Sequence, residues 1–198
     1  AQLGFRTFNE MIGRSDLLEM NKAIDFWKAQ GLDYSGILYR ASEKSDEVRC
    51  TMRQETGLEG AFDYEVLKTV ESSIETKQPV TLNLPIHNTN RTFGTIISSR
   101  IAKKYGYAGL PDDTITIHLK GSAGQSLGAF AAHGLTIDLE GEANDYIGKG
   151  LSGAKIIVRP PKESTFAPED NVIGGNVILY GATSGEVYLN GRVGERFG

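Results

Sequence analysis

The sequence predicts a mainly β fold: a right-handed parallel β-helix built from single-stranded coils of about 20 residues, preceded by a short α-helical segment. Two observations carry this prediction. Gly121, Gly141 and Gly181 lie at multiples of 20 residues from one another. Pro161 occupies the one point of this 20-residue grid that lacks a glycine. A β-branched residue lies four residues before each of the four grid points: Ile117, Ile137, Ile157 and Val177. A fixed period with strand-forming residues indicates coils that stack on their neighbours.

Residues 1–79 are expected to form a helical connecting segment. Thr7 followed by Glu10 matches a capping box, which predicts a short helical hook in residues 1–20. Residues 21–31 predict a second helix that ends at Gly31. A third helix begins at Asp63, because apolar residues recur on one face at helical spacing: Val66, Leu67, Val70 and Ile74.

Residues 80–198 are expected to form the β-helix domain, which we interpret as truncated at its C-terminal end. The alternation in residues 80–85 predicts a half-buried strand. Thr92 is placed to cap a helix over about 93–105 that ends at Gly106. A solenoid that ends at Gly198 would present an open coil, so we expect either self-association through that end or covering by the N-terminal helices.

The coils themselves read ITIHLKG, LTIDLEG, KIIVRPP and NVILYG. Strict alternation in the first two places isoleucine and leucine inward and polar residues outward. Stacking then predicts one core ladder of Ile117, Ile137, Ile157 and Val177. Gly121, Gly141 and Gly181 are expected at coil corners, where the backbone turns with positive φ or packs closely.

Composition narrows the classes of function. The 198 residues carry a net charge of −4, which does not favour a nucleic-acid surface, and no apolar run approaches the ~20 residues of a membrane span. The single cysteine, Cys50, cannot supply an internal disulfide or an all-thiolate metal cluster. It fits a reducing compartment, so we expect a cytoplasmic protein without nucleic-acid or membrane partners.

The string GKGLSG at residues 148–153 matches a dinucleotide-binding fingerprint letter for letter, and Asp170 follows about 20 residues later. That motif requires a preceding strand and a following helix. Here a strand, AKIIV, follows instead, so we interpret the glycines as a coil corner.

Four carboxylates form an acidic strip across one coil: Asp138, Glu140, Glu142 and Asp145. Paired carboxylates about 5–10 Å apart can perform acid–base chemistry on glycosides, but we favour a solvated strand face as the explanation of the pattern. His118 is expected one coil from Asp138 on the same face. The two could form a catalytic pair or a surface cross-strand pair, and we favour the latter.

Several long strings resemble the C-terminal, Gly-rich region of the glutamate synthase large subunit: LGFRTFNEMIGRSDLL (3–18), NTNRTFGT (88–95), GLPDDTITIHLKGSAGQSLGAF (109–130), LEGEANDYIGKGLSG (139–153), NVILYGATSGE (176–186) and GERF (194–197). The resemblance covers essentially the whole chain in order. A weaker likeness, in the coil pattern alone, is to the Gly-rich subunits of formylmethanofuran dehydrogenases.

The resemblance implies a β-helix that braces an amidotransferase domain and an FMN-binding domain beside an ammonia tunnel. The enzyme it implies converts glutamine and 2-oxoglutarate to two glutamates in ammonia assimilation. FMN and an iron–sulfur cluster would lie elsewhere in that enzyme, and no catalytic, cofactor or metal residue of the family maps onto this chain. The electron donor is decided outside this region.

Two alternatives remain open. One is a stand-alone β-solenoid subunit that docks on another oxidoreductase. The other is a carbohydrate-active β-helix enzyme that uses the strip from Asp138 to Asp145.

Overall fold

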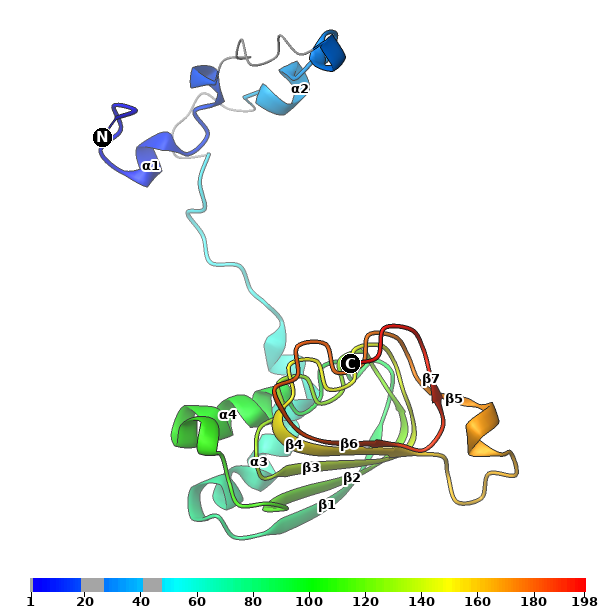
Figure 1. The fold of residues 1–198 in the computed structure, drawn as a ribbon. Coiled ribbons are helices and arrows are strands. Elements are labelled where there is room, and N and C mark those ends of the chain that lie inside the picture. The colour runs from blue at the N-terminus through cyan, green and yellow to red at the C-terminus, as the bar shows by residue number, and fades with distance from the viewer. Residues whose placement is uncertain (1, 19–26, 41–47) are drawn as a thin grey trace. The chain divides into compact units, whose positions relative to one another are not determined.

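The computed structural model describes residues 2–18, 27–40 and 48–198, which divide into two compact units, Ala1–Thr56 and Gly57–Gly198 (Figure 1). The expected boundary after residue 79 therefore differs from the division in the structure. Residues 57–79 belong to the same unit as the strands, because the apolar face of their helix is buried in the core of that unit.

The first unit contains only short elements: α1 (Phe8–Met11), η1 (Ser15–Leu17), η3 (Trp27–Ala29) and α2 (Ser35–Leu38). Thr7 caps α1 as its sequence predicts, because the hydroxyl of Thr7 accepts the backbone N–H of Glu10 at 3.3 Å. Of the helix expected over residues 21–31, the positions up to 26 lie outside the described residues. Its remainder begins with a single 3₁₀ turn at Trp27.

The second unit begins with η5 (Leu58–Gly60) and contains two α-helices, α3 (Phe62–Thr76) and α4 (Thr95–Tyr105), which are separated by the first strand of the sheet. The short helix η6 (Gly106–Ala108) follows α4. The stripe predicted on α3 is buried, with Val70 fully inaccessible. α4 begins two residues later than expected. Thr92 and Gly94 both have positive φ, and Gly94, with no side-chain hydrogen bond, precedes the helix.

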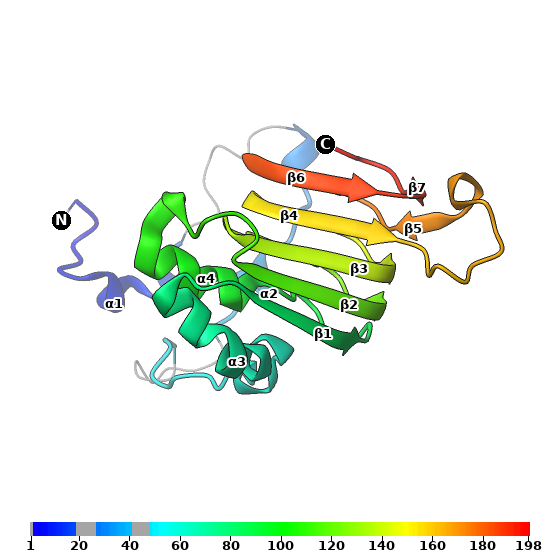
Figure 2. The ribbon, with the colours of Figure 1, turned by 90° about the horizontal axis from the view of Figure 1, so that it is seen from below.

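All described strands belong to one parallel sheet (Figure 2). Its strands are β1 (Val80–Ile86), β2 (Ile115–Ala123), β3 (Leu135–Ala143), β4 (Ser152–Arg159), β5 (Val172–Gly174), β6 (Ser184–Leu189) and β7 (Arg192–Val193). The order is β1-β2-β3-β4-β6, while β5 pairs with β3 and β7. The short helix η7 (Pro168–Asp170) interrupts the connection from β4 to β5.

The predicted right-handed β-helix is therefore wrong. The described residues form a single open parallel sheet with helices, and the chain does not close into a solenoid of several sheets. The 20-residue period predicted the parallel register between β2 and β3 correctly, because Ile117 lies opposite Ile137, which follows it by 20 residues. A period constrains how strands stack, but it does not determine whether the rest of each repeat forms strands.

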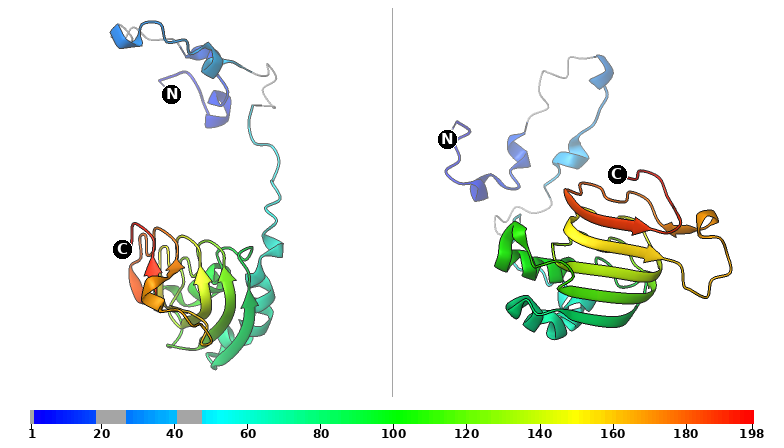
Figure 3. Two further views of the ribbon diagram at one scale, coloured as in Figure 1. Left: turned by 90° about the vertical axis from the view of Figure 1, so that its right-hand side faces the viewer. Right: turned by 60° about the horizontal axis from the view of Figure 1, so that its bottom comes forward.

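Opposite the sheet, three successive layers of turns replace the further strands that a β-helix would need (Figures 1 and 3). In each layer, φ is positive at every second residue: Ser126, Gly128 and Phe130; Tyr146, Gly148 and Gly150; Val177, Leu179 and Gly181. Backbone hydrogen bonds join the layers, such as Gly148 N–H to the carbonyl of Leu127 at 2.8 Å. The glycines of GKGLSG thus belong to a turn layer and to the start of β4.

The core lies between this sheet and the turn layers. One inward row runs across five strands: Leu82, Ile117, Ile137, Ile156 and Val187. The expected ladder differs after Ile137. Ile157 lies opposite Asp138 on the outer face of the sheet, and Val177 lies in a turn layer. The repeat between β3 and β4 is one residue shorter than 20, and a slip of one residue exchanges the two faces of a strand.

Gly121 and Gly141 lie in register with Ile86 where the strands bend. A Cβ on Gly141 would overlap the carbonyl oxygen of Gly121, and a Cβ on Gly121 would overlap that of Ile86. Gly181 differs, because its surroundings are open and only its φ of 69° favours glycine.

Candidate functional site

A groove of about 660 Å³ crosses the outer face of the sheet over β1 to β4. It is lined by Asn83, Leu84, Pro85, His118, Leu119, Lys120, Asp138, Glu140 and Arg159. The parallel register places the polar side chains in two rows. One row runs from Asn83 through His118 to Asp138, and the other from Lys120 through Glu140 to Arg159.

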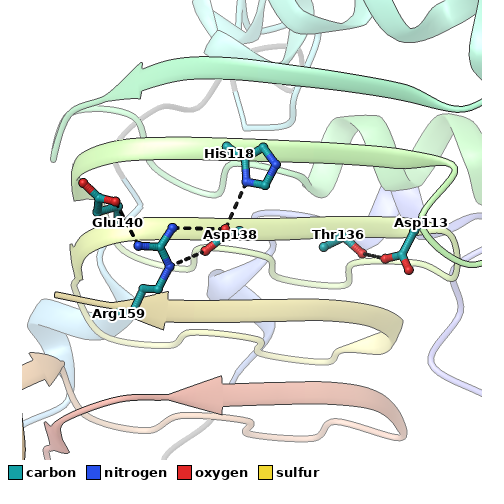
Figure 4. A network of polar contacts seen from close by, with 6 residues as sticks. All are labelled: Asp113, His118, Thr136, Asp138, Glu140 and Arg159. Carbon is teal, nitrogen blue, oxygen red and sulfur yellow. Dashed lines mark hydrogen bonds and ion pairs between the residues drawn. The ribbon is translucent and has the colours of Figure 1, made fainter. Parts of the chain in front are cut away.

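Arg159 joins two carboxylates of β3 (Figure 4). Its Nη1 donates to Oε2 of Glu140 at 2.8 Å. Its Nε and Nη2 donate to the two carboxylate oxygens of Asp138 at 3.2 and 3.3 Å. The planar guanidinium suits this double contact, since its donors form a rigid fork that matches carboxylate oxygens.

His118 reaches Asp138 from the other side, with 3.0 Å between its Nδ1 and Oδ2 of the carboxylate. An ionised carboxylate only accepts hydrogen bonds, so Nδ1 carries the proton in this contact. In Figure 4 the second ring nitrogen of His118 points away from Asp138. The predicted pair of His118 and Asp138 is therefore present, and Arg159 joins it to Glu140 in a cross-strand network of four residues.

The electrostatics of the groove follow from Arg159. Its hydrogen bond holds the pKa of Glu140 below the ordinary value, with Lys120 assisting and partial burial opposing. The hydrogen bonds to Glu140 and Asp138 in turn raise the pKa of Arg159. Lys120 is 3.5 Å from Glu140, and its side chain is 71% exposed. The groove thus combines the two acids Asp138 and Glu140 with the basic side chains of Arg159, Lys120 and His118.

A second polar cluster lies near the start of the same strands. Asp113 accepts a hydrogen bond from the hydroxyl of Thr136 at 2.6 Å and pairs with Lys155 at 3.1 Å (Figure 4 shows the contact with Thr136). The hydrogen bonds from Thr136 and Lys155 lower the pKa of Asp113. Asp113 has a φ of 56°, a conformation that aspartate tolerates better than most residues.

The acidic strip does not form a free pair of carboxylates. Asp138 and Glu140 both bind Arg159, and Glu142 accepts from the hydroxyl of Ser122 at 3.1 Å. The carboxylate of Asp145 accepts the backbone N–H of Asn176 at 2.7 Å. All four carboxylates therefore make structural contacts, so no observation favours the glycoside chemistry.

Arg159 is the residue that the sequence pattern missed. A strict period of 20 places Pro160 opposite Glu140, whereas the shortened repeat brings Arg159 there. The alternation within KIIVR, with Ile156 and Val158 inward and Arg159 outward, is the signal that could have shown this.

The described residues hold no group of three or more histidine, cysteine, aspartate or glutamate side chains that could bind a metal ion. Cys50 is exposed, and its thiol contacts the carbonyl of Met52 at 3.1 Å. One cysteine cannot provide the several thiolates that an iron–sulfur cluster needs, so this chain does not fit that group. In the described part of the chain, no helix is both long and apolar enough to cross a membrane.

Comparison with known proteins gives a family match over most of the chain. The GXGXG motif family matches residues 63–198, which include the sheet, the groove and the turn layers. The chain is 50% identical over 200 aligned residues to the glutamate synthase [NADPH] large chain of Bacillus subtilis. It is 44% identical to the glutamate synthase [NADH] of Saccharomyces cerevisiae, and 41% identical to the ferredoxin-dependent glutamate synthase 2 of Synechocystis.

Each of these alignments covers 100% of this chain but only 13%, 9% and 13% of the respective relatives. The chain thus spans about a tenth of the length of the relatives that it matches. The resemblance seen in its motifs is confirmed: the chain belongs to the GXGXG motif family and corresponds over its whole length to a region of glutamate synthase large chains.

Proposed function

We propose that this chain serves as the GXGXG-motif region of a glutamate synthase, the enzyme that forms two glutamates from glutamine and 2-oxoglutarate. In this role it is a non-catalytic scaffold that braces the amidotransferase and FMN-binding domains beside an ammonia tunnel. The observation that carries the proposal is the 50% identity to the glutamate synthase [NADPH] large chain over all of this chain.

The structure of the second unit supports a scaffold role. The inward side chains of β2 and β3 are almost fully buried, and Ile117 and Ile137 have no accessible surface. Rows of apolar side chains in exact register give a rigid support. The acids and bases of the outer face are held in mutual ion pairs rather than left as free catalytic groups.

The cofactors of the proposed enzyme, FMN and an iron–sulfur cluster, would be bound by its other domains. Relatives named for NADPH, NADH and ferredoxin all match this same region. A region shared by all three types is not expected to select the electron donor. We therefore assign donor choice to other parts of the enzyme.

The test is a chimera of the Bacillus subtilis large chain in which this chain replaces the matching region. A scaffold predicts that the chimera retains glutamate synthase activity. Asp138→Asn in the groove should leave the rate nearly unchanged, whereas Ile137→Ala in the core should lower the melting temperature of the whole protein. Full loss of activity in Asp138→Asn, with an unchanged melting temperature, would contradict the scaffold role.

The isolated chain provides an independent check. Mixed with FMN and then passed through a desalting column, it should retain no flavin absorbance. Stoichiometric flavin retained by the chain would place cofactor binding in this region and overturn the proposal.

A further inference from the structure

The first unit differs from the second in having no buried core. None of its described residues up to Thr56 is buried, whereas the second unit buries a continuous apolar cluster. We propose that residues 2–18 are a docking surface that packs against an apolar face of another domain of a glutamate synthase large chain. This inference rests on the proposed function, and it names the part of this chain that contacts the other domains.

The side chains that the first unit exposes are those that a folded protein normally buries. Large apolar residues are mostly accessible to solvent among its described positions: Leu3, Phe8, Leu18, Ile37 and Tyr39. Ordering a segment costs conformational entropy, and burial of apolar surface is the main contribution that offsets this cost. Exposed apolar side chains that gather in one segment mark a contact surface. We therefore expect another surface to supply the core that this unit lacks.

An apolar groove in residues 2–11 is the feature that a partner side chain can enter. Its volume is about 520 Å³, and its apolar walls are Leu3, Phe5, Phe8 and Met11. Phe8 is 80% exposed and Leu3 is 76% exposed, so both line the groove and remain accessible. Aromatic side chains and methionine are enriched in the cores of protein interfaces, where a few aromatic anchors carry most of the binding energy.

Local hydrogen bonds hold the groove in shape without a core. The carboxylate of Glu10 accepts the backbone N–H of Arg6 at 2.9 Å and its guanidinium Nε–H at 3.1 Å. The hydroxyl of Thr7 accepts the backbone N–H of Glu10, which fixes the start of α1. A surface that is ordered before binding loses less conformational entropy when it binds.

The charges of residues 2–18 favour an apolar partner over a charged one. The segment has two basic side chains, Arg6 and Arg14, and two acidic ones, Glu10 and Asp16. Arg6 pairs with Glu10 at 3.1 Å, and Arg14 pairs with Asp16 at 2.8 Å. A partner recognised by electrostatic complementarity requires an excess of one charge, which this segment does not offer.

The comparisons with relatives indicate which partner carries the apolar face. The GXGXG family model begins at residue 63, whereas the alignments with the three glutamate synthases cover all of this chain. Residues 2–18 thus match these enzymes outside the GXGXG motif region. The three relatives are named for NADPH, NADH and ferredoxin, so a partner common to them is not specific to one electron donor. We therefore assign the apolar face to the part of the large chain that the three enzymes share.

Hydrogen–deuterium exchange tests the contact in the isolated chain and in the chimera with the Bacillus subtilis large chain. We expect the backbone amides of residues 2–18 to exchange at least about tenfold more slowly in the chimera, because docking suppresses local opening. Equal exchange in the two proteins would overturn the proposal. Slow exchange in the isolated chain would also overturn it, because the segment would then pack within this chain or on a second copy.

Phe8→Ala tests whether the apolar groove is the surface in contact. In the chimera it should accelerate exchange in residues 2–18 by about tenfold, as expected for the loss of an interface anchor. In the isolated chain it should leave the melting temperature unchanged, because Phe8 is exposed there. A lower melting temperature of the isolated variant would show that Phe8 packs within this chain and would contradict the proposal.

Asn9→Ala is the matched control for this substitution. Asn9 is the next exposed residue of α1 and does not line the apolar groove. The control should exchange like the parent chimera. Equal acceleration by Asn9→Ala and Phe8→Ala would show a general effect on α1 and overturn the role of the groove.

Glutamate synthase activity separates this inference from the proposed function. An active chimera in which residues 2–18 exchange as fast as in the isolated chain would overturn the docking surface and leave the proposed function intact. An inactive chimera in which the same residues are protected would support the docking surface and contradict the proposed function.

Discussion

The carboxylate of Asp63 accepts the backbone N–H of Gly94 at 2.9 Å, across 31 residues of sequence. It also accepts the N–H of Ile96 at 2.7 Å and that of Ile97 at 3.3 Å. Asp63 is 3% exposed, so a buried acid in α3 caps the beginning of α4. The N-cap position of α4 is occupied by Gly94, which has no side chain to cap the helix, and Thr92, two residues earlier, has a left-handed conformation.

Loss of this cap should destabilise the second unit. Asp63→Ala leaves at least two buried N–H groups without partners, which we expect to lower the free energy of unfolding by about 2–4 kcal/mol. Chemical denaturation measures the change. Glu65→Ala, an exposed acid in the same turn of α3, is the control and should cost less than about 0.5 kcal/mol. Equal losses would show that Asp63 acts through helix propensity alone.

Asp63 also makes the stability of the second unit depend on pH, and the sign of this dependence follows from its pKa. Burial raises the pKa of Asp63, and the hydrogen bonds from Gly94, Ile96 and Ile97 only partly oppose it. The folded chain therefore binds this proton more tightly than the unfolded chain. The stabilising contribution of Asp63 should be largest at acid pH and decrease as the pH rises from about 4 through its folded pKa. Denaturation of the parent chain and of Asp63→Asn across this range should show the difference narrowing as the pH rises.

The pH dependence of stability that Glu140 contributes has the opposite sign to that of Asp63. Arg159 lowers the pKa of Glu140, so its contribution to stability is present above the ordinary glutamate value of about 4.3 and is lost as the pH falls through the folded pKa. Arg159→Gln should remove this dependence, and its stability deficit should shrink between pH 6 and pH 3. Contributions from Asp113 occur in both proteins and cancel in the difference. A deficit that stays constant with pH would contradict this origin.

The register of β4 can be tested by two neighbouring substitutions. Ile156 has no accessible surface, whereas Ile157 is partly exposed on the outer face. Ile156→Ala should cost about 2–5 kcal/mol of stability, and Ile157→Ala less than about 1 kcal/mol. Thermal or chemical unfolding of both variants measures the two losses of stability. The reverse order would restore the register expected from a strict period of 20.

Two of the grid glycines, Gly141 and Gly181, should respond differently to alanine. Gly141→Ala places a methyl group against the carbonyl of Gly121 at a φ of 150°, so we expect a loss of more than about 2 kcal/mol. Gly181→Ala meets open space and carries only the left-handed backbone cost of about 1 kcal/mol. Equal losses at both positions would contradict the close approach at Gly141.

The sequence determined the local elements and the family. Helix α3 followed from the stripe of Val66, Val70 and their neighbours, and the cap of α1 followed from Thr7, because both signals lie within one or two helical turns. The register of β2 on β3 followed from identical alternation 20 residues apart. Long motifs, which carry far more information than composition, identified the glutamate synthase relationship.

Only the tertiary structure decided the remainder. The single open sheet, the turn layers and the inward position of Ile156 depend on how each repeat crosses the core, which the period leaves undetermined. The cap of α4 by Asp63 and the binding of Glu140 by Arg159 join residues 31 and 19 positions apart. The alternation in β4 places Arg159 on the outer face but does not identify its partners, because a hydrogen bond depends on distances that the folded chain alone establishes.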